Sequence, residues 1–233
     1  MEWQEAVEYL TPYVVKISTP QGSGTGFLLT YSAESPFCSV ATAAHVVDHA
    51  HYWEQPIRLD HGSGKSVLLR HDQRAIFLDE SRDTAAILFS KADFPVPLSA
   101  PAELTPKGLW LKTGIEVGWV GYPAVSPQTL CFFSGRVSAY LNATSAYLVD
   151  GVSINGVSGG PTFFLRPNDL VVIGVVSAYI PNRATGDVLP GLAVIRDVIQ
   201  FQELANTFKS LDQAKEEETT PTEPPPPQPE TGA

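Results

Sequence analysis

The sequence is poor in cysteine and in long apolar runs, and it lacks the pattern of a secretory signal. Only 2 of the 233 residues are Cys, which is too few for a disulfide-rich secreted domain and is typical of a reducing compartment. No uncharged apolar run of about 18 residues occurs, so the sequence predicts no transmembrane helix and no membrane partner. The first residues lack a basic segment followed by an apolar one, and we expect a cytoplasmic protein.

Basic residues are scarce relative to acidic ones. Lys and Arg number 15 against 25 Asp and Glu, which gives a formal net charge of −10, and no basic stripe occurs. A nucleic-acid partner is therefore not expected. The histidines His49, His51, His61 and His71 match no tight ligand spacing and have no cysteine beside them, so the sequence predicts no metal site and no cofactor.

The remaining composition is that of a globular protein with a distinct C-terminal end. Hydrophobic residues make up 43% of the chain, which is enough for a core in one domain of roughly 200 residues or in two smaller ones. Residues 212–233 hold six acids, one base and the proline run Pro224–Pro227. We expect a folded domain at 1–211 and an acidic, Pro/Glu-rich disordered tail at 212–233. The tail is either a solvated spacer or a ligand for a proline-recognising regulatory partner.

Hydrophobic spacing predicts helices only near the two ends of the folded part. Ile195–Lys215 has the spacing of one amphipathic helix, and Trp3, Val7 and Leu10 share the face of a shorter one. Between them, short runs rich in Val, Ile, Phe and Tyr are separated by turn residues, which predicts an all-β domain, either antiparallel β-barrels or a large sandwich. The expected strands are Tyr13–Ser18, Gly26–Thr30, Phe37–Thr42, Val67–Arg70, Ala75–Leu78, Thr84–Phe89, Glu116–Val120, Leu130–Tyr140, Ala146–Val149, Thr162–Leu165, Val171–Ile180 and Leu189–Val194.

Three segments carry residues that could act together chemically. His45 lies among small residues at the end of an apolar strand, Asp83 lies at the start of another, and Ser158 lies in the glycine-rich segment 156–160. Each alone is typical of a loop or turn. A serine hydroxyl needs a base to take its proton, and the imidazole needs a carboxylate to fix its tautomer, so this order of His, Asp and Ser predicts nucleophilic catalysis. The glycines around Ser158 also allow backbone N–H groups to converge on one anion.

These segments resemble those of the trypsin-like serine proteases, and more closely their bacterial HtrA/Deg branch. The resemblance covers about Tyr13 to Leu211. It implies two antiparallel six-stranded β-barrels followed by a C-terminal α-helix, with an active site in the cleft between the barrels. The matching segments are Tyr13–Ile17, Gly22–Leu29, Thr42–Val47, Asp83–Leu88, Val120–Pro123, Ser134–Ser138 and the span from Asp150 to Pro161.

The resemblance also implies a role for each site residue. It makes Ser158 the nucleophile, His45 the general base and then acid, and Asp83 the carboxylate that orients the imidazole. The backbone N–H groups of Gly156 and Ser158 would form the oxyanion hole. The implied activity of the domain at 1–211 is that of a serine endopeptidase, which cleaves protein or peptide substrates through an acyl-enzyme.

A second group of residues is implied to contact the substrate. Ser177 falls where the family has a polar residue near the catalytic carboxylate, and we expect it to hydrogen-bond Asp83. The strand that continues through Ala178 and Tyr179 would pair with the substrate backbone. Trypsin has an aspartate at the position of Val152, so cleavage after Lys or Arg is not expected. With Tyr179 on the rim, a small or medium apolar residue before the cut is predicted.

Departures from the family's pattern keep other functions open. Val157 stands where the secreted digestive enzymes have an aspartate that pairs with a newly cut N-terminus, so that route of activation is not available to this chain. HtrA proteases usually carry a PDZ domain, which this sequence lacks, and their trimeric chaperone-protease behaviour is not expected here. A catalytically silent peptide-binding module and a latent protease activated by a partner are the alternatives to an active enzyme.

Overall fold

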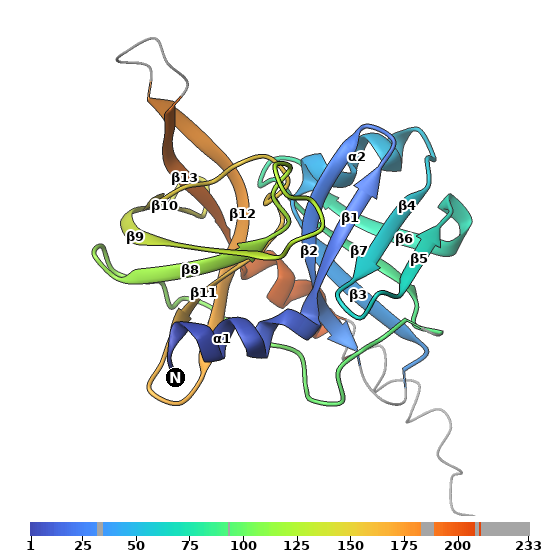
Figure 1. The fold of residues 1–233 in the computed structure, drawn as a ribbon, viewed down its shortest axis with the longest axis horizontal. Coiled ribbons are helices and arrows are strands. Elements are labelled where there is room, and N and C mark those ends of the chain that lie inside the picture. Colours follow the sequence, from blue (N-terminus) through green and yellow to red (C-terminus); the bar gives the residue numbers. More distant parts are fainter. Residues whose placement is uncertain (32–34, 93, 183–188, 208–209, 211–233) are drawn as a thin grey trace, which may run out of the picture.

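The chain folds into two β-rich halves that lie side by side (Figure 1). The computed structural model describes residues 1–31, 35–92, 94–182, 189–207 and 210, with the backbone alone for residues 179–182, 189 and 190. The predicted tail at 212–233 lies outside these residues. Within them, no helix has the length and apolar character needed to cross a lipid bilayer.

The N-terminal half is a seven-stranded antiparallel sheet with the strand order β5-β4-β1-β2-β3-β7-β6. The short helix α1 (Trp3–Leu10) and the 3₁₀ turn η1 (Thr11–Tyr13) precede it, and helix α2 (Ala44–Tyr52) follows its third strand. The strands are β1 (Val14–Thr19), β2 (Gly22–Tyr31), β3 (Phe37–Thr42), β4 (Ile57–His61), β5 (Ser66–Leu69), β6 (Arg74–Asp79) and β7 (Thr84–Ser90).

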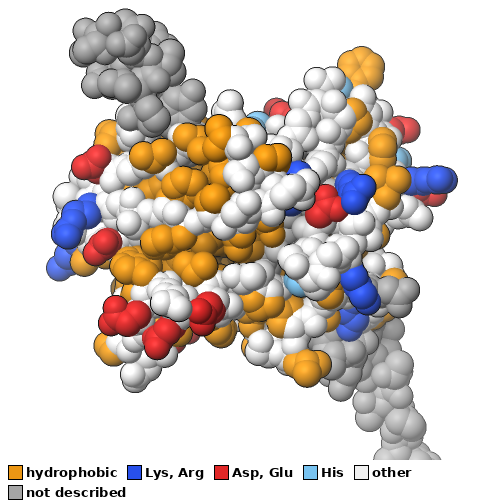
Figure 2. Space-filling model, viewed as in Figure 1, with side chains coloured by type: hydrophobic (Ala, Val, Ile, Leu, Met, Phe, Trp, Pro, Cys, Tyr) orange, Lys and Arg blue, Asp and Glu red, His pale blue; other side chains and the backbone are white. Residues whose placement is uncertain are grey.

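The C-terminal half is a closed six-stranded barrel with the order β10-β13-β12-β11-β8-β9. Residues 199–207, after the last strand, are helical and return toward the sheet half (Figure 1). On the face of the barrel seen in Figure 2, apolar side chains gather over several strands. The strands are β8 (Glu116–Gly121), β9 (Cys131–Leu141), β10 (Ala146–Asp150), β11 (Pro161–Leu165), β12 (Leu170–Asn182) and β13 (Leu189–Asp197).

The expected all-β fold with two antiparallel halves and a C-terminal helix is confirmed, but the sheet half has one strand more than the six expected for its barrel. It has seven strands because Ile57–His61, which was not predicted, pairs with β1. It is not closed by strand pairing, because the 3₁₀ turn η2 (His71–Gln73) separates β5 from β6. The guanidinium of Arg74 fills this gap instead. It donates to the carbonyls of Leu69 at 2.6 Å, Gln55 at 2.6 Å and Ala50, near the end of α2, at 3.0 Å.

Buried side chains form a cluster inside each half and a third cluster between the halves. The third cluster joins Phe27 of β2 to Val120 of β8 and to Phe201 of the C-terminal helix, and α1 adds Ala6 and Leu10. The rings of Phe27 and Phe201 meet edge to face with centroids 6.4 Å apart. Because a fully buried Leu or Phe side chain stabilises a fold by about 1.5–3 kcal/mol, the two terminal helices hold the halves together.

The two predicted terminal helices are present, but the C-terminal one begins later than expected. Ile195 still belongs to β13, where it pairs with Tyr147 of β10 and Val176 of β12. Ile195 is therefore buried in the barrel core, Val198 is buried in the cluster between the halves, and the helix begins at 199. A further helix, α2, was not predicted. It is only nine residues long and carries His45 in its first turn.

Candidate active site

His45 is positioned by the junction between β3 and α2. Ala43 has an extended backbone (φ −79°, ψ 146°) and supplies no side-chain cap to the helix. The backbone N–H of His45 instead donates to Oδ1 of Asp83 at 3.0 Å. A negative charge at a helix N-terminus is favourable because the first N–H groups lack partners within the helix. Asp83 therefore caps α2, and the same contact fixes the position of the His45 backbone from which the imidazole side chain extends.

Asp83 lies in the tight turn between β6 and β7, in a left-handed backbone conformation with φ 50°. Its N–H donates to the carbonyl of Glu80 at 3.2 Å, which closes the turn. Few residues other than glycine adopt this conformation, and Asp is among the better tolerated, so the turn accommodates a carboxylate here. The His45 ring nitrogen Nδ1 lies 3.0 Å from both carboxylate oxygens.

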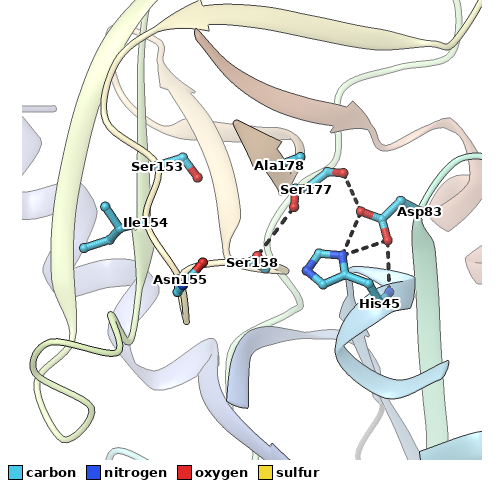
Figure 3. Close-up of a pocket in the computed structure, with 8 residues that line it drawn as sticks. All are labelled: His45, Asp83, Ser153, Ile154, Asn155, Ser158, Ser177 and Ala178. Carbon is cyan, nitrogen blue, oxygen red and sulfur yellow. Dashed lines mark hydrogen bonds and ion pairs between the residues drawn. The ribbon is translucent and has the colours of Figure 1, made fainter. Parts of the chain in front are cut away.

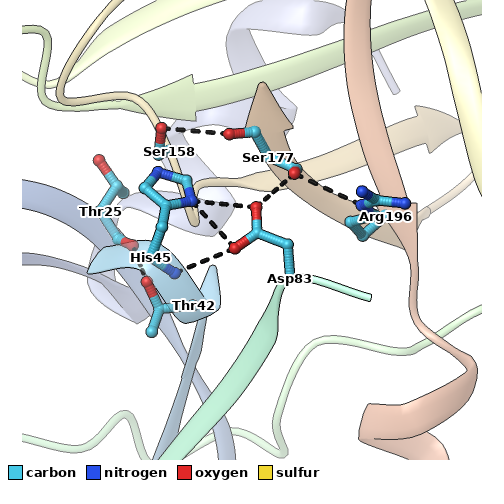
Figure 4. Close-up of polar contacts among 7 residues, drawn as sticks. All are labelled: Thr25, Thr42, His45, Asp83, Ser158, Ser177 and Arg196. Atoms are coloured by element: carbon cyan, nitrogen blue, oxygen red, sulfur yellow. Dashed lines mark hydrogen bonds and ion pairs between the residues drawn. The ribbon is translucent and has the colours of Figure 1, made fainter. Parts of the chain in front are cut away.

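Ser177 supplies a further contact to the carboxylate from the opposite half of the molecule. Its hydroxyl is buried and donates to Oδ2 of Asp83, as expected from the sequence (Figure 4). The pairing of β12 with β13 shifts register between Val176 and Ala178, so Ser177 occupies a β-bulge that redirects its side chain. Nε of Arg196 donates to the Ser177 hydroxyl at 3.4 Å, so the hydroxyl is held on both sides.

The contacts between Asp83 and His45 change the pKa of both groups. The hydrogen bond to Asp83 raises the pKa of His45 above 6.5, although burial of the ring opposes this. Burial alone would raise the pKa of Asp83, but hydrogen bonds from His45 and Ser177 outweigh it and hold the pKa below 3.8. Asp83 is therefore ionised near neutral pH. Its carboxylate favours the imidazole tautomer with the proton on Nδ1, which leaves Nε2 able to accept a proton.

The segment that carries Ser158 is held at every carbonyl from 155 to 158. Two of these carbonyls accept from Thr25 of β2 in the other half, and a third accepts from the N–H of Ala124. The four contacts are Ala124 N–H to Asn155 O at 2.7 Å, Thr25 Oγ1 to Gly156 O at 2.8 Å, Gly160 N–H to Val157 O at 2.9 Å and Thr25 N–H to Ser158 O at 2.8 Å.

Only some of the N–H groups of the same segment donate hydrogen bonds. Val157 donates to the carbonyl of Ile154, and Gly159 donates to the carbonyl of Val176. Within the part of the chain that the structure describes, the N–H groups of Gly156 and Ser158 have no hydrogen-bond partner. In a trans peptide the C=O and N–H point in opposite directions, so the bond from Ala124 to the Asn155 carbonyl directs the Gly156 N–H away from Ala124.

Gly156 cannot be replaced by a larger residue without moving the backbone. Its φ is 91°, a left-handed conformation that favours glycine, and an added Cβ would lie 2.4 Å from the carbonyl oxygen of Tyr122. This glycine therefore fixes the pattern of donors along the segment. Among the described residues, the N–H groups of residues 156 and 158 lack a partner, and the N–H of residue 157 between them has one.

The Ser158 hydroxyl faces the same cavity as His45 without contacting it. Ser158 Oγ donates to the carbonyl of Ser177 over a long 3.5 Å, and no hydrogen bond joins it to His45 among the described residues. Both side chains line one cavity of about 300 Å³ (Figure 3). The structure thus brings His45, Asp83, Ser158 and Ser177 together, with the base and the serine not yet in hydrogen-bond contact.

Val157 and Val152 occupy different environments from each other. Val157 is fully buried in the core cluster of the barrel, together with Trp119 and Ile173. It anchors the serine segment by apolar packing, where an aspartate would have needed a charged partner. Val152, which was expected to contact the substrate, is 48% exposed and does not line the cavity, whereas the buried Ser153 does.

The rest of the cavity lining is small or uncharged. Ala178 lies in it as expected, and the sequence reasoning missed Ser153, Ile154 and Asn155. The prediction for Val152 identified this segment of the chain, but the residue that lines the cavity is its neighbour Ser153. The side chain of Tyr179 lies outside the described residues. No cluster of three or more His, Cys, Asp or Glu able to hold a metal occurs within the described ranges.

Solved structures similar to this chain are proteases. The inactive form of the Rv3671c protease from M. tuberculosis is 22% identical with a TM-score of 0.58, covering 83% of this chain and 87% of that one. Its active form is 23% identical with a TM-score of 0.58 and covers 82% and 78%. Deg5 is 19% identical with a TM-score of 0.59 and covers 84% and 91%. At these identities the likeness shows the fold alone. No family model matches the chain, and no curated protein matches its sequence.

Proposed function

We propose that this chain, which has the fold of the trypsin-like and HtrA-type protease domains, is a serine endopeptidase. One observation carries the proposal. The imidazole–carboxylate pair of His45 and Asp83 borders the same cavity as Ser158, and the Ser158 segment holds two N–H groups without partners among the described residues. A base, a nucleophile and donors for an oxyanion are the groups that acyl transfer requires.

In the proposed mechanism, Ser158 Oγ attacks the carbonyl carbon of the scissile peptide bond and its proton passes to Nε2 of His45. The oxyanion of the tetrahedral intermediate accepts from the N–H groups of Gly156 and Ser158. The intermediate collapses to an ester on Ser158 as His45 gives its proton to the leaving amine. Water then attacks the ester, His45 takes a proton from it, and the second collapse returns that proton to Ser158. Asp83 remains ionised throughout and stabilises the imidazolium.

We propose that the residue before the cut is small or medium in size and uncharged. Beside the three proposed catalytic side chains, the lining residues Ser153, Ile154, Asn155, Ser177 and Ala178 carry no charge, so none pairs with a Lys or Arg side chain. The catalytic groups line the same cavity of about 300 Å³, so the scissile bond has to occupy part of it, which leaves limited room for the substrate side chain. Cleavage profiling on a peptide library should give Ala, Val or similar residues at this position, and a preference for Lys or Arg would contradict the assignment.

We further propose a reducing, cytoplasmic setting and a regulatory partner for the tail. Cys38 and Cys131 are both free thiols, and burial raises the pKa of Cys38 to about 12, so its thiol is unreactive at neutral pH. The proline run Pro224–Pro227 supports recognition of the tail by a proline-binding domain. Cell fractionation tests the compartment. Binding of a synthetic 212–233 peptide to SH3 and WW domains tests the partner.

A latent protease is the second candidate, and one observation favours it. Ser158 Oγ donates to the Ser177 carbonyl at 3.5 Å and makes no hydrogen bond to His45 within the described residues. A partner or substrate that moves this hydroxyl would complete the site. The solved structures do not separate the two states, because the active and inactive forms of Rv3671c match the chain with the same TM-score of 0.58.

A fluorophosphonate probe, which phosphonylates only an activated serine and releases fluoride, tests these proposals on the full chain. We expect the wild type to be labelled, Ser158→Ala to be unlabelled, and the control Ser138→Ala, at an exposed position on β9, to be labelled like the wild type. Peptide hydrolysis should fall on the order of 10⁶-fold in Ser158→Ala, as for other triad serines. Labelling only after a partner is added would support the latent enzyme. A wild type that is never labelled but still binds peptides would support the silent module.

A further inference from the structure

Thr25 belongs to the sheet half but makes three of its hydrogen bonds with the barrel half. It lies in β2, its side chain has no solvent exposure, and it is flanked by Gly24 and Gly26. The Gly-Ser-Gly-Thr-Gly sequence of residues 22–26 lies in the segment Gly22–Leu29 that matches the protease family, and the sequence analysis assigned Thr25 no role. In the structure these residues are part of a strand that runs against the segment carrying Ser158.

The Thr25 hydroxyl uses both of its hydrogen-bonding capacities across the junction between the halves. Oγ1 donates to the carbonyl of Gly156 at 2.8 Å and accepts from the backbone N–H of Tyr122 at 2.9 Å. The Thr25 backbone N–H donates to the carbonyl of Ser158 at 2.8 Å. Thr25 therefore holds the peptide units on both sides of the one that carries the Ser158 N–H.

The same residue is also tied to the strand that leads to His45. The hydroxyl of Thr42, the last residue of β3, donates to the carbonyl of Thr25 at 2.7 Å (Figure 4). Thr42 lies three residues before His45 in the chain. Thr25 is thus the common partner of the serine segment on one side and of the β3–α2 junction on the other.

The flanking glycines explain how β2 can approach so closely. A Cβ added at Gly24 would lie 2.6 Å from a methyl group of Val46 and 3.0 Å from the carbonyl oxygen of Ser158. A Cβ added at Gly26 would lie 2.6 Å from a methyl group of Val40. Only Thr25 in this stretch carries a side chain into the junction, and that side chain is fully hydrogen-bonded.

We propose that the Thr25 hydroxyl is a positioning residue that holds the N–H groups of Gly156 and Ser158 in register with His45. This inference rests on the proposed protease function. Without the hydroxyl, the buried carbonyl of Gly156 and the N–H of Tyr122 lose their partners, and the peptide unit after Gly156 keeps one hydrogen bond, from the Val157 N–H to the carbonyl of Ile154 at 3.2 Å. A shift of this loosened peptide unit changes the direction of the Ser158 N–H, which belongs to the next one. The hydroxyl acts through the backbone and does not touch the reacting atoms.

The test measures the fluorophosphonate labelling kinetics of Ser158 in full-length variants, with KI separated from kinact. Thr25→Val keeps the side-chain shape and removes the hydroxyl, whereas Thr25→Ser keeps the hydroxyl. The matched control is Thr105→Val, which removes another buried hydroxyl that donates to the carbonyl of Val172 at 3.1 Å, away from the serine segment. Thermal melts of all variants report folding.

We expect Thr25→Val to lower kinact on the order of 10- to 100-fold while KI stays within about threefold, because displacing an oxyanion donor weakens stabilisation of the transition state more than binding. Thr25→Ser should recover most of the rate, and Thr105→Val should stay within about twofold of the wild type. Should Thr25→Val not fold, Thr25→Ser and Thr25→Ala make the same comparison, because they differ only in the hydroxyl.

The inference is overturned if the wild type is labelled and Thr25→Val is labelled at the same rate. It is also overturned if Thr105→Val loses as much kinact as Thr25→Val, since the effect would then be one of general stability. A wild type that is not labelled at all contradicts the proposed function itself, which is a separate result.

Discussion

The seven-stranded sheet and the six-stranded barrel contribute different groups to the shared cavity and hold them by different means. The sheet half brings His45 and Asp83, which lie on a helix start and a strained turn that are joined by a carboxylate. The barrel half brings Ser158 on a segment whose carbonyls are all held and whose Val157 is buried in the barrel core. The acid–base pair therefore depends on one side chain, whereas the nucleophile depends on a backbone framework.

The largest effect expected from a change in the sheet half comes from Asp83→Asn. The amide cannot accept from the His45 N–H, the His45 ring and Ser177 as a carboxylate does, and it favours the wrong imidazole tautomer. We expect kcat to fall about 10⁴-fold, the size of effect known for this substitution in trypsin. Steady-state hydrolysis of a reporter peptide measures it. A loss below about tenfold, in a variant that melts like the wild type, would show that Asp83 does not serve the imidazole.

The closure of the sheet half can be broken with Arg74→Met. Methionine retains part of the apolar stem but leaves the carbonyls of Leu69, Gln55 and Ala50 without the guanidinium. Hydrogen bonds to charged groups contribute about 1.5–3 kcal/mol each, and partial replacement by water reduces the total, so we expect the free energy of unfolding to fall by about 3 kcal/mol. Urea denaturation measures the change. The control Arg58→Met, on an exposed ion pair with Asp60, should change the value by less than about 1 kcal/mol.

The barrel half is tested by Val157→Ala, which removes two buried methyl groups from the anchor of the serine segment. Truncation of a buried aliphatic side chain of this size costs about 2 kcal/mol through lost burial and the cavity left behind. The same denaturation experiment measures it. Val125→Ala, at a position that is 84% exposed, is the matched control and should be neutral. Equal effects at the two positions would show that Val157 does not anchor the segment.

The pH dependence of kcat/KM tests the sheet half separately from the barrel half, because both titrating groups, His45 and Asp83, belong to the sheet half. Activity needs neutral His45, whose pKa lies above 6.5, so kcat/KM should fall as the pH drops through that raised value. In Asp83→Asn this acid limb should move to lower pH, because the contact that raises the pKa is lost. An acid limb that stays in place would contradict the coupling.

The same pKa shifts predict opposite effects on stability. The raised pKa of His45 contributes stability that is complete below pH 6.5 and is lost as the pH rises through the folded-state pKa. The lowered pKa of Asp83 contributes stability that is present above pH 3.8 and is lost as the pH falls through the folded-state value. Chemical denaturation at a series of pH values, compared with His45→Ala, separates the two contributions.

The smallest effect is expected from Thr162→Val in the barrel. The Thr162 hydroxyl is buried and has no hydrogen-bond partner among the described residues, so valine removes a polar group that gains nothing from burial. We expect the free energy of unfolding to stay within about 0.5 kcal/mol of the wild type or to rise slightly, with unchanged labelling of Ser158. A loss above about 1 kcal/mol would indicate that the hydroxyl has a partner in solution.

Much of the fold could be predicted because its strands have a strong local signal. Phe37–Thr42 is a β-branched and aromatic run between turn residues, and it forms β3 with the expected bounds. Ile57–His61 was missed although its alternation of apolar and charged residues is the pattern of a half-buried strand, so the sequence could have revealed it. Helix α2 was missed because its nine residues show weaker apolar periodicity than the similarly short α1. The open edge between β5 and β6 depends on long-range pairing, which no local pattern encodes.

The site residues could be predicted where the residue type and its sequence context indicate the same chemistry. His45, Asp83 and Ser158 stand in distinctive contexts, and the expected contact of Ser177 with Asp83 is present. Contact of Val152 with the substrate stays a prediction. Whether residue 152 or 153 lines the cavity depends on how the chain leaves β10, which sequence spacing does not reveal. Thr25 was missed because a threonine between two glycines is typical of a turn. Its importance comes from a partner segment more than a hundred residues away in the chain.

The two N–H groups at 156 and 158 have a consequence for the resting molecule. Among the described residues neither N–H has a protein partner, and Ser158 lines the cavity, so water or a bound anion has to supply that partner in solution. A scaffold optimised for heat resistance alone would satisfy both donors internally. A small anion that fits between them should therefore raise the melting temperature of this protein, and the folded state becomes most stable when the site is occupied.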